Sequence, residues 1–137
     1  MRTLHLGLRV TDLATSLDWY LALGYQVVGR VELDDGATLT MLRFPGEAAV
    51  SLELVHRPAD GPVDVGSGFN HLVVQVDDLN EALPSLRAAG MDPEPVQAPG
   101  GEEGPRTSWL TDPDGYRIEL VQWPPGHPDG MTEADFA

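Results

Sequence analysis

The amino-acid sequence predicts an α+β protein made of two βαβββ modules whose strands form a concave mixed sheet. The chain matches itself at an offset of 66 residues, so that His5 aligns with His71 and Glu53 with Glu119. An internal repeat of this kind indicates that both halves share one architecture. Several short segments alternate apolar and polar residues, as half-buried strands do, and two longer segments have helical spacing instead. Strands grouped with helices on one side are typical of the α+β class.

The first module is expected to span residues 1–57. A strand over residues 3–10 would place Leu4, Leu6, Leu8 and Val10 on one side. Thr11 or Asp12 is a suitable N-cap for a helix that continues through Leu13, Leu17 and Leu21 and ends at Gly24. Three further strands are predicted at 26–32, 38–44 and 48–55, with turns at 34–36 and 45–46.

Residues 58–68 have the composition of a linker, and the second module is expected to span residues 69–123. A strand over residues 70–76 would precede a helix capped by Asp77, Asp78 or Asn80 and ending at Gly90. Pro84 fits this helix only if the helix starts late or its first turn is loose. Residues 91–105 predict a short or irregular strand, and strands at 106–111 and 116–122 flank a turn at 112–115. Residues 124–137 form a turn-rich C-terminal tail.

Composition excludes several classes of function. The 137 residues carry a net charge of −14, which would repel nucleic-acid phosphates. No apolar run approaches the ~20 residues needed to cross a bilayer, and the N-terminus lacks a signal-peptide pattern. We therefore expect a cytoplasmic protein with no nucleic-acid or membrane partner. The absence of Cys excludes disulfides, thiolate metal ligands and a cysteine nucleophile.

Alternation along the strands predicts one polar face opposite the face covered by the helices. The odd-numbered residues of the four central strands share this face: His5, Arg9, Glu53, His71, Gln75, Arg117 and Glu119. A His and a Glu 48 residues apart recur in both halves, which points to two imidazoles and two carboxylates around one metal ion. Such donors suit Zn²⁺, Ni²⁺, Co²⁺, Mn²⁺ or Fe²⁺. A closed tetrahedral site would be structural, whereas octahedral coordination would leave positions for substrate.

Four segments carry a family resemblance: H-L-G-L-R-V-T-D-L, S-L-E-L-V, F-N-H-L-V-V-Q-V-D-D and D-P-D-G-Y-R-I-E-L. They resemble the vicinal oxygen chelate superfamily, and most closely the bacterial glyoxalase I enzymes. The resemblance covers the chain to about Trp123. It implies one divalent metal ion (Ni, Zn or Co) held by His5, Glu53, His71 and Glu119. It also implies a homodimer in which each site takes ligands from both chains.

The reaction implied by this resemblance is a carbon–sulfur lyase reaction that detoxifies methylglyoxal. The hemithioacetal of methylglyoxal, or of a similar 2-oxoaldehyde, is isomerised through an enediolate to an S-lactoyl-type thioester. Glu119 is the expected base and Glu53 the second proton carrier. Arg9 matches the family's Arg that binds a thiol carboxylate, and Trp109, which shares the odd-numbered face of the sheet, is expected to line the substrate. Arg57 stands where the family usually has Asn, and residues 97–106 lack the family's Lys. The sequence therefore does not identify which thiol forms the substrate adduct.

Other activities are consistent with the same pattern. A CoA-thioester epimerase would share the enediolate chemistry. An extradiol dioxygenase or an antibiotic-resistance thiol transferase would use three protein ligands and leave Glu53 superfluous. A bleomycin-resistance-like binding protein would sequester a drug without catalysis and would need none of the four metal ligands.

Overall fold

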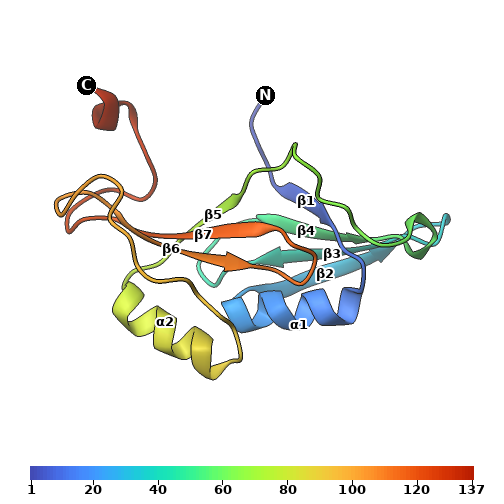
Figure 1. Ribbon diagram of the computed structural model, residues 1–137. Coiled ribbons are helices and arrows are strands. Elements are labelled where there is room, and N and C mark those ends of the chain that lie inside the picture. The colour runs from blue at the N-terminus through green and yellow to red at the C-terminus, as the bar shows by residue number, and fades with distance from the viewer. The chain divides into compact units, whose positions relative to one another are not determined.

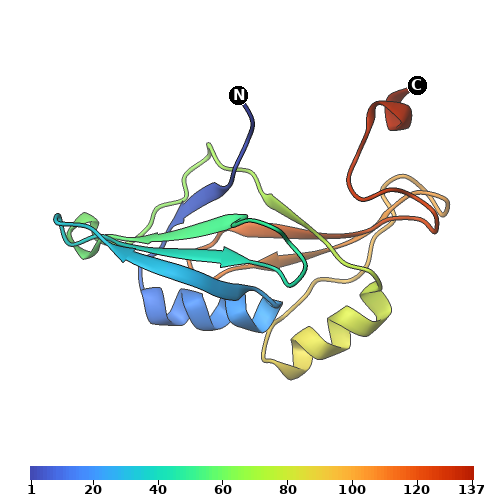
Figure 2. The ribbon, with the colours of Figure 1, turned by 180° about the vertical axis from the view of Figure 1, so that it is seen from behind.

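The first module folds into a four-stranded sheet with one helix against it. The computed structural model describes residues 1–137. The elements are β1 (Leu6–Arg9), α1 (Leu13–Leu23), β2 (Gln26–Glu32), β3 (Thr38–Arg43) and β4 (Leu52–His56). The strand order is β1-β4-β3-β2, in which β1 and β4 are parallel and the other pairs antiparallel. Figures 1 and 2 show α1 lying along one face of this sheet, which confirms the βαβββ arrangement predicted for this module.

Local signals in the sequence explain the ends of α1. Asp12 is the N-cap, and its side chain accepts a hydrogen bond of 2.8 Å from the Thr15 N–H. Gly24 ends the helix with a φ of 121°, a conformation that residues with a Cβ rarely adopt. The helix packs over a core in which Leu52 and Leu54 of β4 are fully buried.

The start of the chain differs from the prediction. Leu4 was expected on the covered face, but it is 69% exposed and precedes β1. Leu6 is 38% exposed, whereas Leu8 is only 3% exposed. Strand pairing with β4 begins at Leu6, so Leu4 lies outside the sheet that α1 covers. The apolar pattern therefore continues beyond the core that this chain forms.

The second module contains one regular strand fewer. Its elements are β5 (Leu72–Gln75), α2 (Leu79–Ala88), β6 (Arg106–Thr111) and β7 (Arg117–Gln122), in the sheet order β5-β7-β6. Between α2 and β6, only a single bridge from Gln97 to Thr107 remains of the expected strand. Four prolines in this segment (Pro93, Pro95, Pro99 and Pro105) lack the N–H that a sheet ladder requires. The two modules thus form two separate mixed sheets, of four and three strands.

Helix α2 contains Pro84, which the sequence pattern allowed only with a late helix start or a loose first turn. Asp78 is the N-cap and the helix begins at Leu79, so Pro84 lies inside the helix and not at a late start. Its missing N–H leaves the Asn80 carbonyl without its helical donor. Asn80 and Pro84 are both exposed, so water can satisfy that carbonyl. The buried side of α2 is made by Leu79, Leu83 and Leu86.

The chain divides into two compact units. The first comprises Met1–Gly68 together with Asp112–Gly115, and the second comprises Phe69–Thr111 together with Tyr116–Ala137. Residues 58–68, expected as a linker, include one short 3-10 helix, η1 (Pro58–Asp60). A second 3-10 helix, η2 (Glu133–Phe136), ends the tail. No helix in the structure is both long and apolar enough to cross a membrane.

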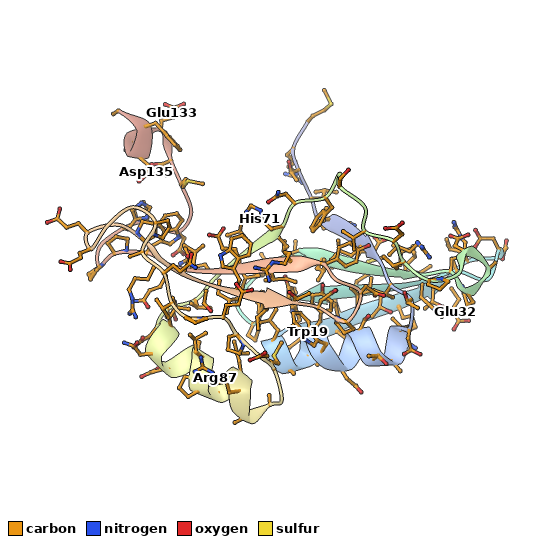
Figure 3. The ribbon with its side chains drawn as sticks, in the orientation of Figure 1. Trp19, Glu32, His71, Arg87, Glu133 and Asp135 are labelled. Carbon is orange, nitrogen blue, oxygen red and sulfur yellow. The ribbon has the colours of Figure 1, made fainter.

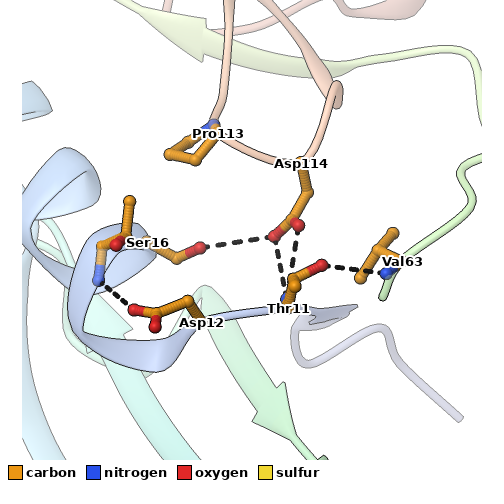
Figure 4. Close-up of a pocket in the computed structure, with 7 residues that line it drawn as sticks. Thr11, Asp12, Ser16, Val63, Pro113 and Asp114 are labelled. Carbon is orange, nitrogen blue, oxygen red and sulfur yellow. Dashed lines mark hydrogen bonds between the residues drawn. The ribbon is translucent and has the colours of Figure 1, made fainter. Parts of the chain in front are cut away.

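The predicted turn at residues 112–115 forms and contacts the beginning of α1 within the first unit. Gly115 closes the turn by donating to the Asp112 carbonyl at 3.1 Å. The Asp114 carboxylate accepts hydrogen bonds from the Thr11 N–H and the Ser16 hydroxyl, at 3.2 and 3.3 Å (Figure 4). These groups line a concavity of about 320 Å³. Because the polar groups that line this concavity form hydrogen bonds with one another, the concavity belongs to the packing around α1.

Replacing Pro84 with Ala should stabilise the protein. Ala restores the missing helical hydrogen bond and removes the clash of the proline ring, which together are worth up to about 3 kcal/mol inside a helix. We expect a gain of roughly 1–2 kcal/mol in the free energy of unfolding, because the lost proline also makes the unfolded chain more flexible. Urea denaturation measures this change. The neighbouring Ser85→Ala is the matched control and should shift stability by less than about 0.5 kcal/mol.

Candidate metal-binding and catalytic site

The first unit brings His5 and Glu53 together. The parallel pairing of β1 with β4 places Gly7 opposite Glu53, and His5 lies two residues before Gly7 on the same side of the chain. The His5 Nε2 is 3.0 Å from the Glu53 Oε2. Their side chains are 31% and 17% exposed, so both are accessible without being fully solvated. Leu52 and Leu54, on either side of Glu53, point into the core instead.

The second unit repeats this arrangement with His71 and Glu119. The parallel pairing of β5 with β7 places Val73 opposite Glu119, and His71 lies two residues before Val73. The His71 Nε2 is 3.4 Å from the Glu119 Oε2, and the side chains are 31% and 19% exposed. Each unit therefore presents one imidazole Nε2 and one carboxylate oxygen at the same place in its sheet.

The donor atoms of each pair fit a shared divalent cation. Imidazole nitrogen and carboxylate oxygen bind Zn²⁺ at about 2.0–2.2 Å, which puts two neighbouring donors roughly 3.0–3.5 Å apart. The observed separations of 3.0 and 3.4 Å lie in this range. No group of three or more His, Asp or Glu side chains is placed to hold a metal ion. The chain thus forms two half-sites, each with two suitable donors.

Asn70 fixes the proton on the His71 ring. Its amide oxygen lies 2.5 Å from the His71 Nδ1. An amide oxygen has no proton to give, so Nδ1–H is the donor in this contact, and Nε2 is the ring nitrogen that lies beside Glu119. Histidines that bind metal through Nε2 commonly have a second partner on the other nitrogen in this way. Sequence analysis gave Asn70 no role, although it stands directly before His71 in the F-N-H segment.

Trp109 lies beside the second half-site. It is paired with Glu119 across β6 and β7, and its ring centroid is 5.1 Å from that of His71 in an edge-to-face contact. The Arg117 guanidinium lies 5.1 Å from the Trp109 ring centroid and makes two hydrogen bonds to Glu94, of 2.8 and 3.0 Å. The hydrogen bond from Arg117 lowers the pKa of the Glu94 carboxyl. This ion pair holds a cation over the indole face.

The arginines of the first unit bond to the protein itself. Arg9 donates from Nη1 to the Gly61 carbonyl at 2.8 Å and from Nη2 to the Pro62 carbonyl at 3.0 Å. Arg57 forms ion pairs with Asp35 at 2.8 Å and with Asp60 at 3.6 Å. Arg9 therefore ties β1 to residues 61–62, a contact that its place in the strand pattern did not reveal.

The chain thus consists of two similar modules, each with one His–Glu pair at the same place in its sheet. A family model described as "Glyoxalase/Bleomycin resistance protein/Dioxygenase superfamily" matches residues 2–120. The chain belongs to this superfamily.

Relatives with assigned names point to one branch of it. The chain is 34% identical over 125 residues to the lactoylglutathione lyase of Neisseria meningitidis serogroup A, covering 89% of this chain and 91% of the relative. It is 32% identical over 127 residues to a probable lactoylglutathione lyase of Synechocystis, covering 89% and 95%.

Solved structures show the same fold. A glyoxalase I variant of Zea mays has a TM-score of 0.79 at 26% identity, over 90% of this chain and 45% of the maize chain. The trypanothione-dependent glyoxalase I of Leishmania major has a TM-score of 0.70 at 27% identity, over 89% and 86%. These matches confirm the fold class and the family resemblance read from the sequence.

Removing the Asn70 side chain should change the tautomer of His71. In Asn70→Ala, Nδ1 loses its acceptor and the Glu119 carboxylate draws the proton to Nε2. Nitrogen NMR of the metal-free protein near pH 8 should show Nδ1–H in the native protein and mainly Nε2–H in the variant. Asn80→Ala, at an exposed position, is the matched control and should leave His71 unchanged. An unaltered His71 spectrum in Asn70→Ala would contradict the assigned role.

Proposed function

We propose that this protein is a metal-dependent lyase of the glyoxalase I type. Its substrate is the hemithioacetal that a small thiol forms with methylglyoxal or a similar 2-oxoaldehyde, and its product is the S-lactoyl-type thioester. The observation that carries the proposal is the repeated His–Glu pair, at 3.0 Å in one unit and 3.4 Å in the other. The named lactoylglutathione lyases among its relatives support the choice of reaction.

His5, Glu53, His71 and Glu119 are the proposed ligands of one divalent ion, with Ni²⁺, Zn²⁺ or Co²⁺ as candidates. A bound divalent cation polarises the adjacent substrate oxygens and so makes the neighbouring C–H more acidic. The contact of Asn70 with the His71 Nδ1 leaves Nε2 on the side of Glu119, where the ion would bind. Binding requires a neutral imidazole and an ionised carboxylate.

Glu119 is the proposed base. It removes the proton from the carbon that bears sulfur and oxygen in the hemithioacetal, which gives an enediolate, and the proton is returned to the adjacent carbon. No atom is gained or lost overall, so the product is an isomer of the substrate. Glu53 is the second proton carrier. Both carboxylates are less than one-fifth exposed, which limits exchange of the transferred proton with water.

We further propose that the protein works as a homodimer, with each site built from the first unit of one chain and the second unit of its partner. Each unit offers two ligands, and the structure groups no three candidate ligands together. Leu4 and Leu6 are exposed next to His5, as expected for residues that a second chain covers.

The substrate contacts are proposed at Arg9 and Trp109. Trp109 offers its ring beside His71. Arg9 bonds the carbonyls of residues 61 and 62, so a carboxylate that binds it must replace or add to these contacts. We propose a cytoplasmic role in aldehyde detoxification, with no nucleic-acid or membrane partner.

Replacing Glu119 with Gln should abolish the lyase reaction, because an amide cannot accept the proton. We expect a loss of at least about 100-fold in kcat, which is within the usual contribution of general base catalysis. The assay follows thioester absorbance with methylglyoxal and several thiols after loading with Ni²⁺, Co²⁺ or Zn²⁺. Glu81→Gln, on the exposed side of α2, is the matched control. Full turnover by Glu119→Gln would contradict the assignment of the base.

Sharing of the site between chains can be tested by mixing two inactive variants. His5→Ala and His71→Ala each damage both sites of their own homodimer. In a heterodimer of the two, one site contains both changes and the other contains neither. Mixing under conditions that exchange subunits should therefore restore up to about half of the native activity per heterodimer. Mixtures that stay as inactive as the separate variants, with exchange confirmed by mass spectrometry, would refute the shared site.

A further inference from the structure

The C-terminal segment, residues 123–137, is attached to the strand that leads from His71. Gln75 lies four residues after His71 on the same face of β5, roughly 13 Å along the strand. Its Oε1 accepts from the Trp123 indole N–H at 3.0 Å and from the Gly130 N–H at 3.3 Å. Its Nε2 donates to the Asp129 carboxylate at 2.7 Å. One side chain thus binds the segment at three points.

His127 makes contacts within the C-terminal segment that hold its parts together. The His127 ring stacks on Trp123 with centroids 4.5 Å apart and an interplanar angle of 12°. Its Nδ1 lies 2.6 Å from the Pro128 carbonyl oxygen, and its Nε2 lies 2.6 Å from the Asp135 Oδ1. Neither oxygen carries a proton, so both ring nitrogens must be donors. Only the protonated imidazolium has two N–H groups.

Acidic groups predominate around His127, although Arg106 and Glu102 line the adjoining concavity together with Trp123. Asp135 faces it from η2 and also caps that helix by accepting from the Thr132 N–H at 2.7 Å. Glu133 lies in the same short helix, Asp129 lies two residues along the chain, and Glu103 lines the same concavity from the loop before β6. The hydrogen bond to Asp135 is the main cause that raises the pKa of His127, and the contact with the Pro128 carbonyl adds to it.

The segment stands on the side of the second sheet that carries His71. Figure 3 shows Glu133 and Asp135 on that side, while α2 lies on the other. Together with the loop at 103–105, the segment borders a mostly apolar concavity of about 340 Å³. Its apolar lining includes Pro105, Trp123, Pro124, Met131 and Phe136. Met131 and Phe136 are 67% and 76% exposed, so this apolar surface is open to solvent.

We propose that the C-terminal segment is a wall of the active site that protonated His127 holds closed and that Gln75 positions. This inference rests on the proposed function for the location of the active site. The closed wall offers apolar contacts to the thiol arm of the substrate, at a distance from the reacting carbon. Loss of the His127 proton removes one of its two donor bonds and sets a lone pair against an acceptor oxygen.

The direction of the pH effect follows from the raised pKa. The closed wall binds the proton more tightly than the released segment, whose His titrates near the ordinary value of about 6.5. We call the two hydrogen bonds from protonated His127 to Pro128 and Asp135 the latch. The latch is fully present below about pH 6.5 and is lost as pH rises through the higher pKa of His127 in the closed form. Between low and high pH, the equilibrium constant for closure falls roughly tenfold for each unit by which the closed form raises the pKa of His127.

Nitrogen NMR and hydrogen exchange of the metal-free protein test the latch without any assay of activity. At pH 6 we expect both His127 nitrogens to be protonated and the Trp123 indole N–H and the Gly130 amide to be protected. Protection, corrected for the intrinsic exchange rate, should fall as His127 deprotonates above pH 6.5. Gln75→Leu should lose protection at both positions at every pH, and His127→Gln should show protection that no longer depends on pH.

Steady-state kinetics of the metal-loaded enzyme test whether the wall contacts substrate. With the best thiol found in the lyase assay, Gln75→Leu should raise KM severalfold and leave kcat within about twofold. With 2-mercaptoethanol, which is too short to reach across roughly 13 Å, KM should not change. Gln26→Leu, at an exposed site in the first unit, is the matched control.

The outcomes separate the two proposals. A His127 that titrates at or below 6.5, or native protection in Gln75→Leu, overturns the latch whether or not the protein is a lyase. An unchanged KM in an active Gln75→Leu enzyme overturns the wall as part of the active site. Absence of lyase activity with every thiol refutes the proposed function, while the exchange experiment still decides the latch.

Discussion

The parallel pairing of the first and last strands of each module is the constraint on which the candidate site depends. It sets Gly7 opposite Glu53 in one unit and Val73 opposite Glu119 in the other. Side chains alternate with a period of two, so a His two residues before each pairing point lies on the same face as the Glu. A shift of one residue in either register would turn the carboxylate into the core. Register alone thus creates both His–Glu pairs.

The same alternation separates stability from chemistry. The neighbours of the two carboxylates, Leu52 and Leu54 in β4 and Ile118 and Leu120 in β7, are fully buried. Burial of these apolar side chains stabilises each module through the face that its helix covers. The opposite face is then free to carry partly exposed imidazoles and carboxylates, which would be costly to bury. Each strand therefore serves the core and the site with alternate residues.

The two half-sites are equivalent in backbone but different in surroundings. Asn70, which orients His71, aligns with Leu4 in the first module at the repeat offset, and Trp109 aligns with Arg43. Gln75 binds the C-terminal segment, whereas Arg9 at the matching position binds residues 61 and 62. The second half-site therefore has a hydrogen-bond partner on its imidazole Nδ1, an aromatic neighbour and a C-terminal segment bound to the same strand. These differences are consistent with the assignment of Glu119, and not Glu53, as the main base.

The sequence by itself determined the features that follow from local periodicity and from the repeat. These are most of the strands, both helices with caps among Thr11 or Asp12 and Asp77, Asp78 or Asn80, the turns, and the shared face of each His and Glu. Only the tertiary structure decided which partners the polar side chains find. Examples are Asn70 on His71, Arg9 on the carbonyls near residue 61, and Gln75 on the segment after Trp123. It also reduced the strand after α2 to a single bridge and left Leu4 outside the core. The reason is physical: periodicity is set by neighbours along the chain, whereas a hydrogen-bond partner or a covering layer depends on residues distant in sequence.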